Sequence, residues 1–231
     1  MGIRRGPNIV QEGLVLSLDA GNVRSYPGSG TAWFDVSGTK INSTLTNGPT
    51  YSSANKGVIN FDGTNDYIDV GNNASLSLGA MTIAAWVKPS TNVSNYRGII
   101  MDESAGGAPW NYRLFLNQSN GVVIYDIIGS AYSSVSSTYS IADNNWHYVC
   151  GVRTSVNGTL NLYINGSLNA TGTDSSNRST LGNTVWIGRS PLGGGSYPFI
   201  GDIPIAQIYN RALTASEILQ NYNMTKSRFG K

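Results

Sequence analysis

The sequence has little charge, almost no cysteine or histidine and no long apolar run, and each shortage excludes a class of protein. Charged residues make up 12% of the 231 residues, and the net charge is +2. A balance this close to neutral does not predict a basic surface for nucleic acid or for an anionic membrane. The one cysteine, Cys150, cannot form an intrachain disulfide, so we expect a small buried side chain.

Targeting segments are also missing from the sequence. No stretch approaches the roughly 18 apolar residues of a membrane-spanning helix. Arg4 and Arg5 have no apolar segment behind them, so residues 1–10 do not read as a secretory signal peptide. We therefore expect a protein that is made in a cytoplasm without a signal peptide and that does not insert into a membrane.

The sequence does contain 40% hydrophobic residues, many of them at the two-residue period of half-buried strands. The clearest example is residues 159–164, where Leu160, Leu162 and Ile164 alternate with more polar residues. The pair Asn165-Gly166 then suits a type I′ turn. With the run from residue 146 to 152, this predicts a three-strand meander over residues 146–170.

Similar runs recur along the chain between turns rich in Gly, Asn, Asp and Ser. Residues 81–88 place Ile83, Ala85 and Val87 on one face and Trp86 on the other. The spacing of the turn signals is typical of an all-β sandwich. The other expected strands are residues 14–19, 58–61, 67–70, 98–101, 112–116, 122–125, 184–188 and 199–209.

One helix is expected, over residues 215–222, as the last regular element. Thr214 and Glu217 form a capping box, and Leu213 and Ile218 can form a hydrophobic staple. The fold class is therefore all-β with one short C-terminal helix. The chain divides into an N-terminal arm, a single domain and a basic, mobile C-terminal tail, at residues 1–10, 11–223 and 224–231.

Several short motifs follow one another in a specific order, at residues 61–68, 81–89, 146–149, 162–166 and 199–213. In this order they resemble the LamG-like, concanavalin A-like jelly-roll superfamily, over roughly residues 10–223. The resemblance implies two antiparallel sheets packed face to face in a jelly-roll sandwich.

The flanking motifs narrow the resemblance. Residues 13–22, the loop 25–30, Trp33 with Asp35, and the ending over residues 221–230 resemble LamG-like proteins of tailed bacteriophages, which are virion structural or decoration proteins. This implies a capsid decoration, fibre or tail-associated subunit on the virion surface. Its partners would be other virion proteins, further copies of this chain and a host-surface glycan. The alternative is a free carbohydrate-binding lectin or adhesin, with or without calcium.

Catalytic groups are sparse. His147 is the one histidine and lies in the middle of an expected strand. Glycosidases of this superfamily place paired carboxylates on alternate residues of one strand, so that both face the cleft. Asp66 with Asp69, and Asp102 with Glu103, have odd spacings that put the two carboxylates on opposite faces. We therefore expect a binding protein and not an enzyme.

Calcium is the one cofactor that the resemblance suggests, because related jelly rolls often hold Ca²⁺ with carboxylates and backbone carbonyls. The candidate ligands are Asp62, in an acidic turn, and Asp202, at the start of the last strand. The carboxylates of the related Ile-Asp-Glu motif are absent here, where the chain reads Ile203-Pro204-Ile205. The alternative for Asp62 is a simple turn in which its side chain bonds its own backbone.

Carbohydrate contact would need loop aromatics with polar neighbours. The candidates are Tyr96, Arg97, Trp110, Asn111 and Tyr197. Core packing or contact between subunits is the alternative role for these side chains. The two basic ends are candidates for docking on an acidic particle surface, with solvated termini as the alternative; their residues are Arg4, Arg5, Lys226, Arg228 and Lys231.

Overall fold

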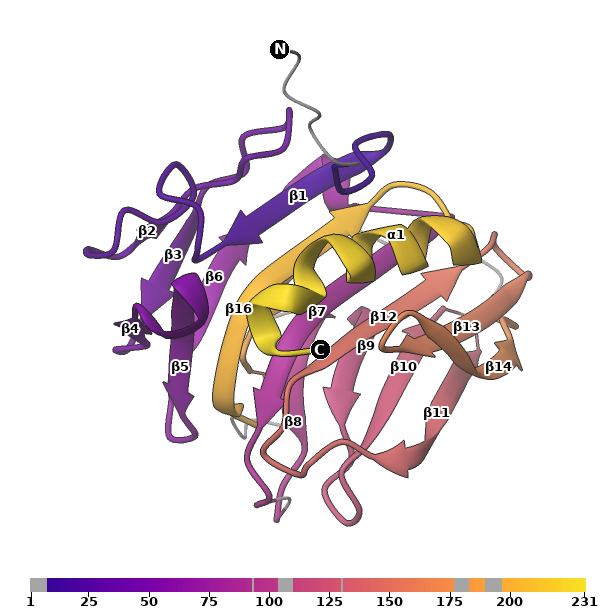
Figure 1. The fold of residues 1–231 in the computed structure, drawn as a ribbon. Coiled ribbons are helices and arrows are strands. Elements are labelled where there is room, and N and C mark those ends of the chain that lie inside the picture. Colours follow the sequence, from indigo (N-terminus) through magenta and orange to yellow (C-terminus); the bar gives the residue numbers. More distant parts are fainter. Residues whose placement is uncertain (1–7, 93, 104–109, 130, 177–182, 190–196) are drawn as a thin grey trace.

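The computed structural model (Figure 1) describes residues 8–92, 94–103, 110–129, 131–176, 183–189 and 197–231. These residues form two eight-stranded antiparallel sheets, which we call sheet A and sheet B. The two sheets stack face to face, and a helix near the C-terminus lies across the outer face of one of them (Figure 1). The all-β sandwich with one short C-terminal helix is confirmed.

Sheet A carries the helix. Its strand order is β14 (Ser167–Thr173), β13 (Thr159–Ile164), β12 (His147–Arg153), β7 (Met81–Pro89), β16 (Ile200–Tyr209), β5 (Val58–Asp62) and β4 (Thr50–Ser52), with β1 (Leu14–Asp19) also paired to β16. Strands β1 and β5 pair with different parts of β16. The last strand therefore links these two early strands within one sheet. The expected meander is confirmed as β12, β13 and β14.

Sheet B forms the opposite layer. Its strand order is β11 (Tyr132–Ser140), β10 (Val122–Ile128), β9 (Trp110–Leu116), β8 (Arg97–Glu103), β15 (Thr184–Ile187), β6 (Tyr67–Gly71), β3 (Ser43–Thr46) and β2 (Ala32–Trp33). Four strands were not expected from the sequence, namely β2, β3, β4 and β11. Strand β11 is rich in serine and has few large apolar residues.

The tight turn that connects β13 to β14 has the expected geometry. Asn165 and Gly166 both have positive φ angles, 53° and 80°, as a type I′ turn requires. A Cβ atom on Gly166 would also lie 3.0 Å from the Tyr222 ring of the helix. The Asn-Gly pair therefore fixes both the hairpin and the close approach of the helix to it.

The main core lies between the sheets, and strand β7 shows how the alternation builds it. Ile83, Ala85 and Val87 point into this core, as expected. Ala84 and Trp86 point to the outer face of sheet A, where they belong to a second apolar cluster with the helix residue Ile218. Sheet A is thus apolar on its inner face and on the part of its outer face that the helix covers. Cys150 is buried in the second cluster, as expected for a small apolar side chain.

The helix α1 (Ala215–Thr225) begins where the capping signal predicts. The Thr214 hydroxyl accepts a hydrogen bond from the Glu217 amide, and the Glu217 carboxylate accepts one from the Thr214 amide. The helix ends at Thr225 and not at Tyr222, and a 3-10 turn, η4 (Lys226–Phe229), follows it directly.

The C-terminal residues form part of the domain surface. Phe229 is buried, and its ring lies 4.3 Å from the Trp86 ring, centroid to centroid. The expectation that residues 224–231 form a mobile tail is therefore wrong. The buried Phe229 ring anchors this segment to the domain. The expected N-terminal arm also reaches the domain at its described end, since the Val10 amide donates to Asn221 Oδ1 at 2.8 Å.

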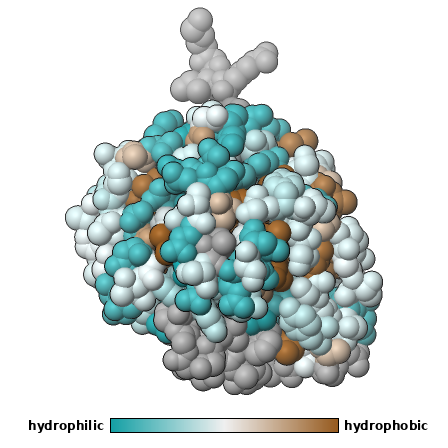
Figure 2. Space-filling model, turned by 90° about the horizontal axis from the view of Figure 1, so that it is seen from below, coloured by the Kyte–Doolittle hydropathy of each residue, from teal (hydrophilic) through white to brown (hydrophobic). Residues whose placement is uncertain are grey.

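In the view of Figure 2, apolar residues appear as separate spots among hydrophilic and intermediate ones. Among the helices of the described chain, none has the length and apolar character to cross a membrane.

Candidate functional site

The two candidate calcium ligands lie on neighbouring strands, β5 and β16. Asp62 Oδ1 accepts a hydrogen bond from the Thr64 amide at 2.7 Å, as in the simple turn considered for it. Asp202 Oδ1 accepts one from Asn60 Nδ2 at 2.8 Å. The described residues contain no group of three or more His, Cys, Asp or Glu side chains that could hold a metal ion. Both carboxylates already accept hydrogen bonds from protein groups. Together they supply fewer than the six to eight oxygen ligands that Ca²⁺ takes.

Three of the five carbohydrate candidates meet at one end of β8. The Tyr96 ring packs edge-on against the Tyr197 ring, with the centroids 5.5 Å apart, and against the Phe115 ring at 5.6 Å. Arg97 is buried and donates from Nη1 to the Pro198 carbonyl at 3.2 Å. Both tyrosines are half-buried. The contacts of Tyr96 and Arg97 thus hold the described segment that begins at Tyr197 against the start of β8.

The other two carbohydrate candidates begin strand β9. Asn111 is fully buried, and its side chain bonds the Asp102 carboxyl. Burial raises the pKa of Asp102 to about 8, and the nearby Glu103 adds to this effect. Asn111 is therefore a partner of a buried acid and not an exposed sugar ligand. The side chain of Trp110 lies outside the described residues.

Two more aromatic residues lie on the outer face of sheet B, and sequence reasoning missed both. Trp186 on β15 and Tyr67 on β6 pack edge to face, with ring centroids 5.1 Å apart. The Arg189 guanidinium lies over both rings, 4.4 Å from the Tyr67 centroid and 5.2 Å from that of Trp186. We call these three residues the arginine–aromatic cluster. Each is half-buried, so part of each side chain reaches solvent.

Polar groups flank the arginine–aromatic cluster on the same face of sheet B. Asp69 is opposite Trp186 in the strand register, and Thr44 of β3 is opposite Asp69. Residues directly opposite in neighbouring strands share a face of the sheet. Arg189 Nε is buried and has no hydrogen-bond partner among the described residues. Half-exposed rings, a cation and flanking polar side chains are what stacking and hydrogen bonding to a sugar require.

A buried ion-pair network lies on the neighbouring strands of the same face. Arg113 donates to both Asp126 oxygens, from Nε at 2.9 Å and from Nη2 at 2.5 Å, and its Nη1 is 3.6 Å from Glu103 Oε1. The Tyr132 hydroxyl donates to Asp126 at 3.1 Å. Burial raises the pKa of Asp126, while the hydrogen bonds from Arg113 act to lower it. The carboxylates of Asp126 and Glu103 are both held by the Arg113 guanidinium. Neither is therefore free to act as a general acid or a general base.

As their odd spacing predicts, the carboxylates of Asp102 and Glu103 lie on opposite faces of the sheet. Asp102 is opposite Val185 in the register and shares the core face, whereas Glu103 is opposite Thr184 and approaches Arg113. His147 is buried, with Nε2 3.0 Å from Asp143 Oδ1. None of these described groups forms a nucleophile–base pair.

The basic C-terminal residues differ in their contacts. Arg228 is bound within the domain: Nη1 is 2.5 Å from Asp19 Oδ1, Nε donates to the Asn55 carbonyl at 2.5 Å, and Nη2 donates to the Gly57 carbonyl. The Lys226 ammonium lies 5.4 Å from the Tyr222 ring centroid, and Lys231 is exposed. Arg4 and Arg5 lie outside the described residues. Arg228 is therefore engaged in the fold, which leaves Lys226 and Lys231 as the described docking candidates.

The alternation of β6 and β15 was the signal that could have identified the missed cluster. Ile68 and Val185 face the core, so Tyr67 and Trp186 must face outward. The sequence does not show that β6 and β15 are neighbours in one sheet, and the cluster depends on that pairing.

Comparison with known proteins gives a family and a fold. The model of the concanavalin A-like lectin/glucanases superfamily matches residues 62–219. Pentraxin-related protein PTX3 of Mus musculus is 26% identical over 152 residues, which are 62% of this chain and 39% of that protein.

Solved structures agree on the fold over most of the chain. The binding domain of paraclostridial mosquitocidal protein 1 has a TM-score of 0.73 and 17% identity, covering 91% of this chain and 52% of that chain. The binding domain of botulinum neurotoxin DC in complex with SialylT has a TM-score of 0.72 and 14% identity, covering 93% of this chain and 52% of that chain. The chain thus spans about half the length of these solved structures.

Proposed function

The chain belongs to the concanavalin A-like lectin/glucanases superfamily, and from this premise we propose that it binds carbohydrate without cleaving it. The binding surface is the arginine–aromatic cluster on the outer face of sheet B. The observation that carries the proposal is the Arg189 guanidinium over the half-exposed rings of Tyr67 and Trp186. A sugar ring would stack on the aromatic surface while its hydroxyls bond Arg189, Asp69 and Thr44.

Two further points support this proposal. The carboxylates of the same face, Asp126 and Glu103, are both paired with Arg113, so neither is free to protonate a glycosidic oxygen. The botulinum neurotoxin DC binding domain, which shares the fold, was solved with SialylT bound.

A glycan array read with the purified protein tests the proposal. We expect binding to at least one glycan, and a loss of about tenfold or more for Trp186→Ala and Tyr67→Ala. Stacking of a nucleobase on one aromatic ring contributes on the order of 1–3 kcal/mol, and we take a stacked sugar ring to contribute at the same scale. Tyr139→Ala removes an exposed tyrosine from β11 and is the matched control. Repeating the array with EDTA tests the calcium prediction for Asp62 and Asp202. An array without any bound glycan in either condition would refute carbohydrate binding.

The glucanase branch of the superfamily is the competing activity. Release of reducing sugar from a polysaccharide, abolished by Glu103→Gln or Asp126→Asn while the variant stays folded, would overturn the non-enzymatic proposal. We expect no release above the buffer control.

We also propose that the protein is displayed on a bacteriophage particle, as a capsid decoration, fibre or tail-associated subunit. The support is the resemblance of residues 13–22 and 221–230 to LamG-like phage proteins. The partners would then be other virion proteins and further copies of the chain, with a host-surface glycan as ligand. Mass spectrometry of purified particles should detect the chain, and its absence from them would leave the free lectin or adhesin.

A further inference from the structure

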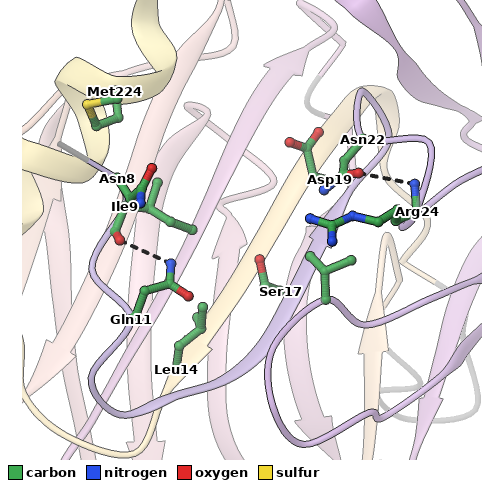
Figure 3. Close-up of a pocket in the computed structure, with 10 residues that line it drawn as sticks. Asn8, Ile9, Gln11, Leu14, Ser17, Asp19, Asn22, Arg24 and Met224 are labelled. Carbon is green, nitrogen blue, oxygen red and sulfur yellow. Dashed lines mark hydrogen bonds between the residues drawn. The ribbon is translucent and has the colours of Figure 1, made fainter. Parts of the chain in front are cut away.

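A groove of about 560 Å³ lies on the other side of the molecule, over strand β1 (Figure 3). Segment 8–11, strand β1, the stretch from residue 22 to residue 36 and the end of helix α1 surround it. Ser17 and Asp19 are opposite Gln207 and Ile205 of β16, and Ile205 belongs to the apolar cluster beneath the helix. The groove therefore opens on the outer face of sheet A, where the helix does not cover β1.

The groove carries one cation without a counter-ion. Arg24 is exposed, and its head group reaches from the loop toward Ser17 (Figure 3). Among the described residues it makes no ion pair, and the carboxylate of Asp19, which also lines the groove, is paired with Arg228 at 2.5 Å. A guanidinium in this situation attracts an anion and can bond a carboxylate through two parallel N–H groups.

The floor of the groove offers an unused hydroxyl. Ser17 is only 3% exposed, yet it lines the groove and its hydroxyl bonds no described residue. Its backbone amide and carbonyl are both occupied, by the Asp35 carboxylate and the Val36 amide. A hydroxyl that lines an open groove can both donate to and accept from a ligand.

The rest of the lining suits a small molecule with many hydroxyls. Side-chain amides come from Asn8, Gln11 and Asn22, and apolar contact from Ile9, Leu14, Val36 and Met224. Gln11 Nε2 donates to the Ile9 backbone carbonyl at 3.1 Å, and Asn22 Oδ1 accepts from the Arg24 backbone amide at 3.1 Å (Figure 3). These bonds fix the two amides and leave each with a free donor or acceptor. The volume lies in the range of sites for small ligands, about 300–1,000 Å³.

We propose that this groove is a second, independent binding site, for an acidic saccharide. Its carboxylate pairs with Arg24, and its hydroxyls bond Ser17 and the amides of the lining. A neutral saccharide would leave the Arg24 charge unused. A strongly charged polyanion is less suited, because the groove has one free cation and several neutral polar groups.

The test uses methyl β-D-glucuronide as the probe and methyl β-D-glucoside as its neutral match, titrated into the full chain by calorimetry or NMR. We expect tighter binding of the glucuronide, by about tenfold, since a hydrogen bond to a charged group is about twice as strong as a neutral one. Arg24→Gln should remove that preference, and Ser17→Ala should weaken both sugars. Arg24 is exposed, so its replacement should not affect folding.

Arg189→Gln, at the arginine–aromatic cluster, is the control that separates this site from the proposed function. The inference is overturned if both sugars bind equally, if Arg24→Gln leaves the preference unchanged, or if Arg189→Gln abolishes it. Loss of array binding in Trp186→Ala bears only on the outer face of sheet B, so the two proposals can fail separately.

Discussion

The outer faces of the two sheets both carry a tryptophan, but the two side chains have different surroundings. On sheet A, Trp86 is fully buried, stacks against Tyr222 at an interplanar angle of 19° and donates from Nε1 to Thr225 at 2.7 Å. On sheet B, Trp186 is half-buried, with Tyr67 and Arg189 as its neighbours. One aromatic surface is covered by the C-terminal helix and holds the fold together. The other is left with a cation and solvent, as a binding surface would be.

Replacing each tryptophan in turn is the strongest test of this difference. Trp86→Ala should lower the free energy of unfolding by about 3–5 kcal/mol, because a large side chain leaves a cavity under the helix. Trp186→Ala should lower it by about 1 kcal/mol or less, since the ring is only partly buried. Urea denaturation followed by circular dichroism measures both. Equal effects on stability would remove the distinction between a structural and a binding face.

A second test asks whether the C-terminal turn belongs to the cover of sheet A. Arg228→Ala should cost about 2 kcal/mol, because it breaks charge-assisted bonds to Asp19, Asn55 and Gly57. The exposed Lys231→Ala is the control and should leave stability unchanged. If the Arg228 variant is as stable as the control but binds particles less well, Arg228 is a docking residue instead.

The elements that the sequence predicted well are those whose signals are local. The Thr214–Glu217 capping box and the Asn165-Gly166 turn depend only on residues within a few positions of each other. The alternation of Ile83 and Trp86 also told the two faces of β7 apart. Strand β11 was missed because its serines pack at the sheet edge through hydrogen bonds, such as that between Ser133 and Ser175.

The site could be predicted only in part, because its contacts join distant parts of the chain. Tyr96 and Tyr197 were selected as loop aromatics, and the fold brings their rings together. Asn111 was selected for its position beside an aromatic residue, yet it is buried next to Asp102. Trp186 could be placed on an outer face, but its partners follow from a strand pairing that local sequence does not encode.

A smaller effect concerns the start of the helix that covers sheet A. Thr214→Ala removes the hydroxyl that accepts from the Glu217 amide, and should cost about 1 kcal/mol. Asn223→Ala, at an exposed position of the same helix, is the matched control and should not destabilise the protein. Thermal unfolding compares the two. Neither variant should alter sugar binding on the outer face of sheet B, and a change there would mean that the two faces are coupled.

The smallest effect is a dependence on pH at the start of the helix that covers sheet A. Two hydrogen bonds from Arg211 hold the Glu217 carboxylate and lower its pKa from 4.5 to about 2. Because the pKa is lower in the folded than in the unfolded state, this pair stabilises the fold above pH 4.5 and loses its effect as the pH falls toward 2. Glu217→Gln should therefore be less stable than the parent chain at pH 7, by less than about 1 kcal/mol for so exposed a pair. The difference should vanish near pH 2, and a difference that persists there would assign the role of Glu217 to its side-chain shape and not to its charge.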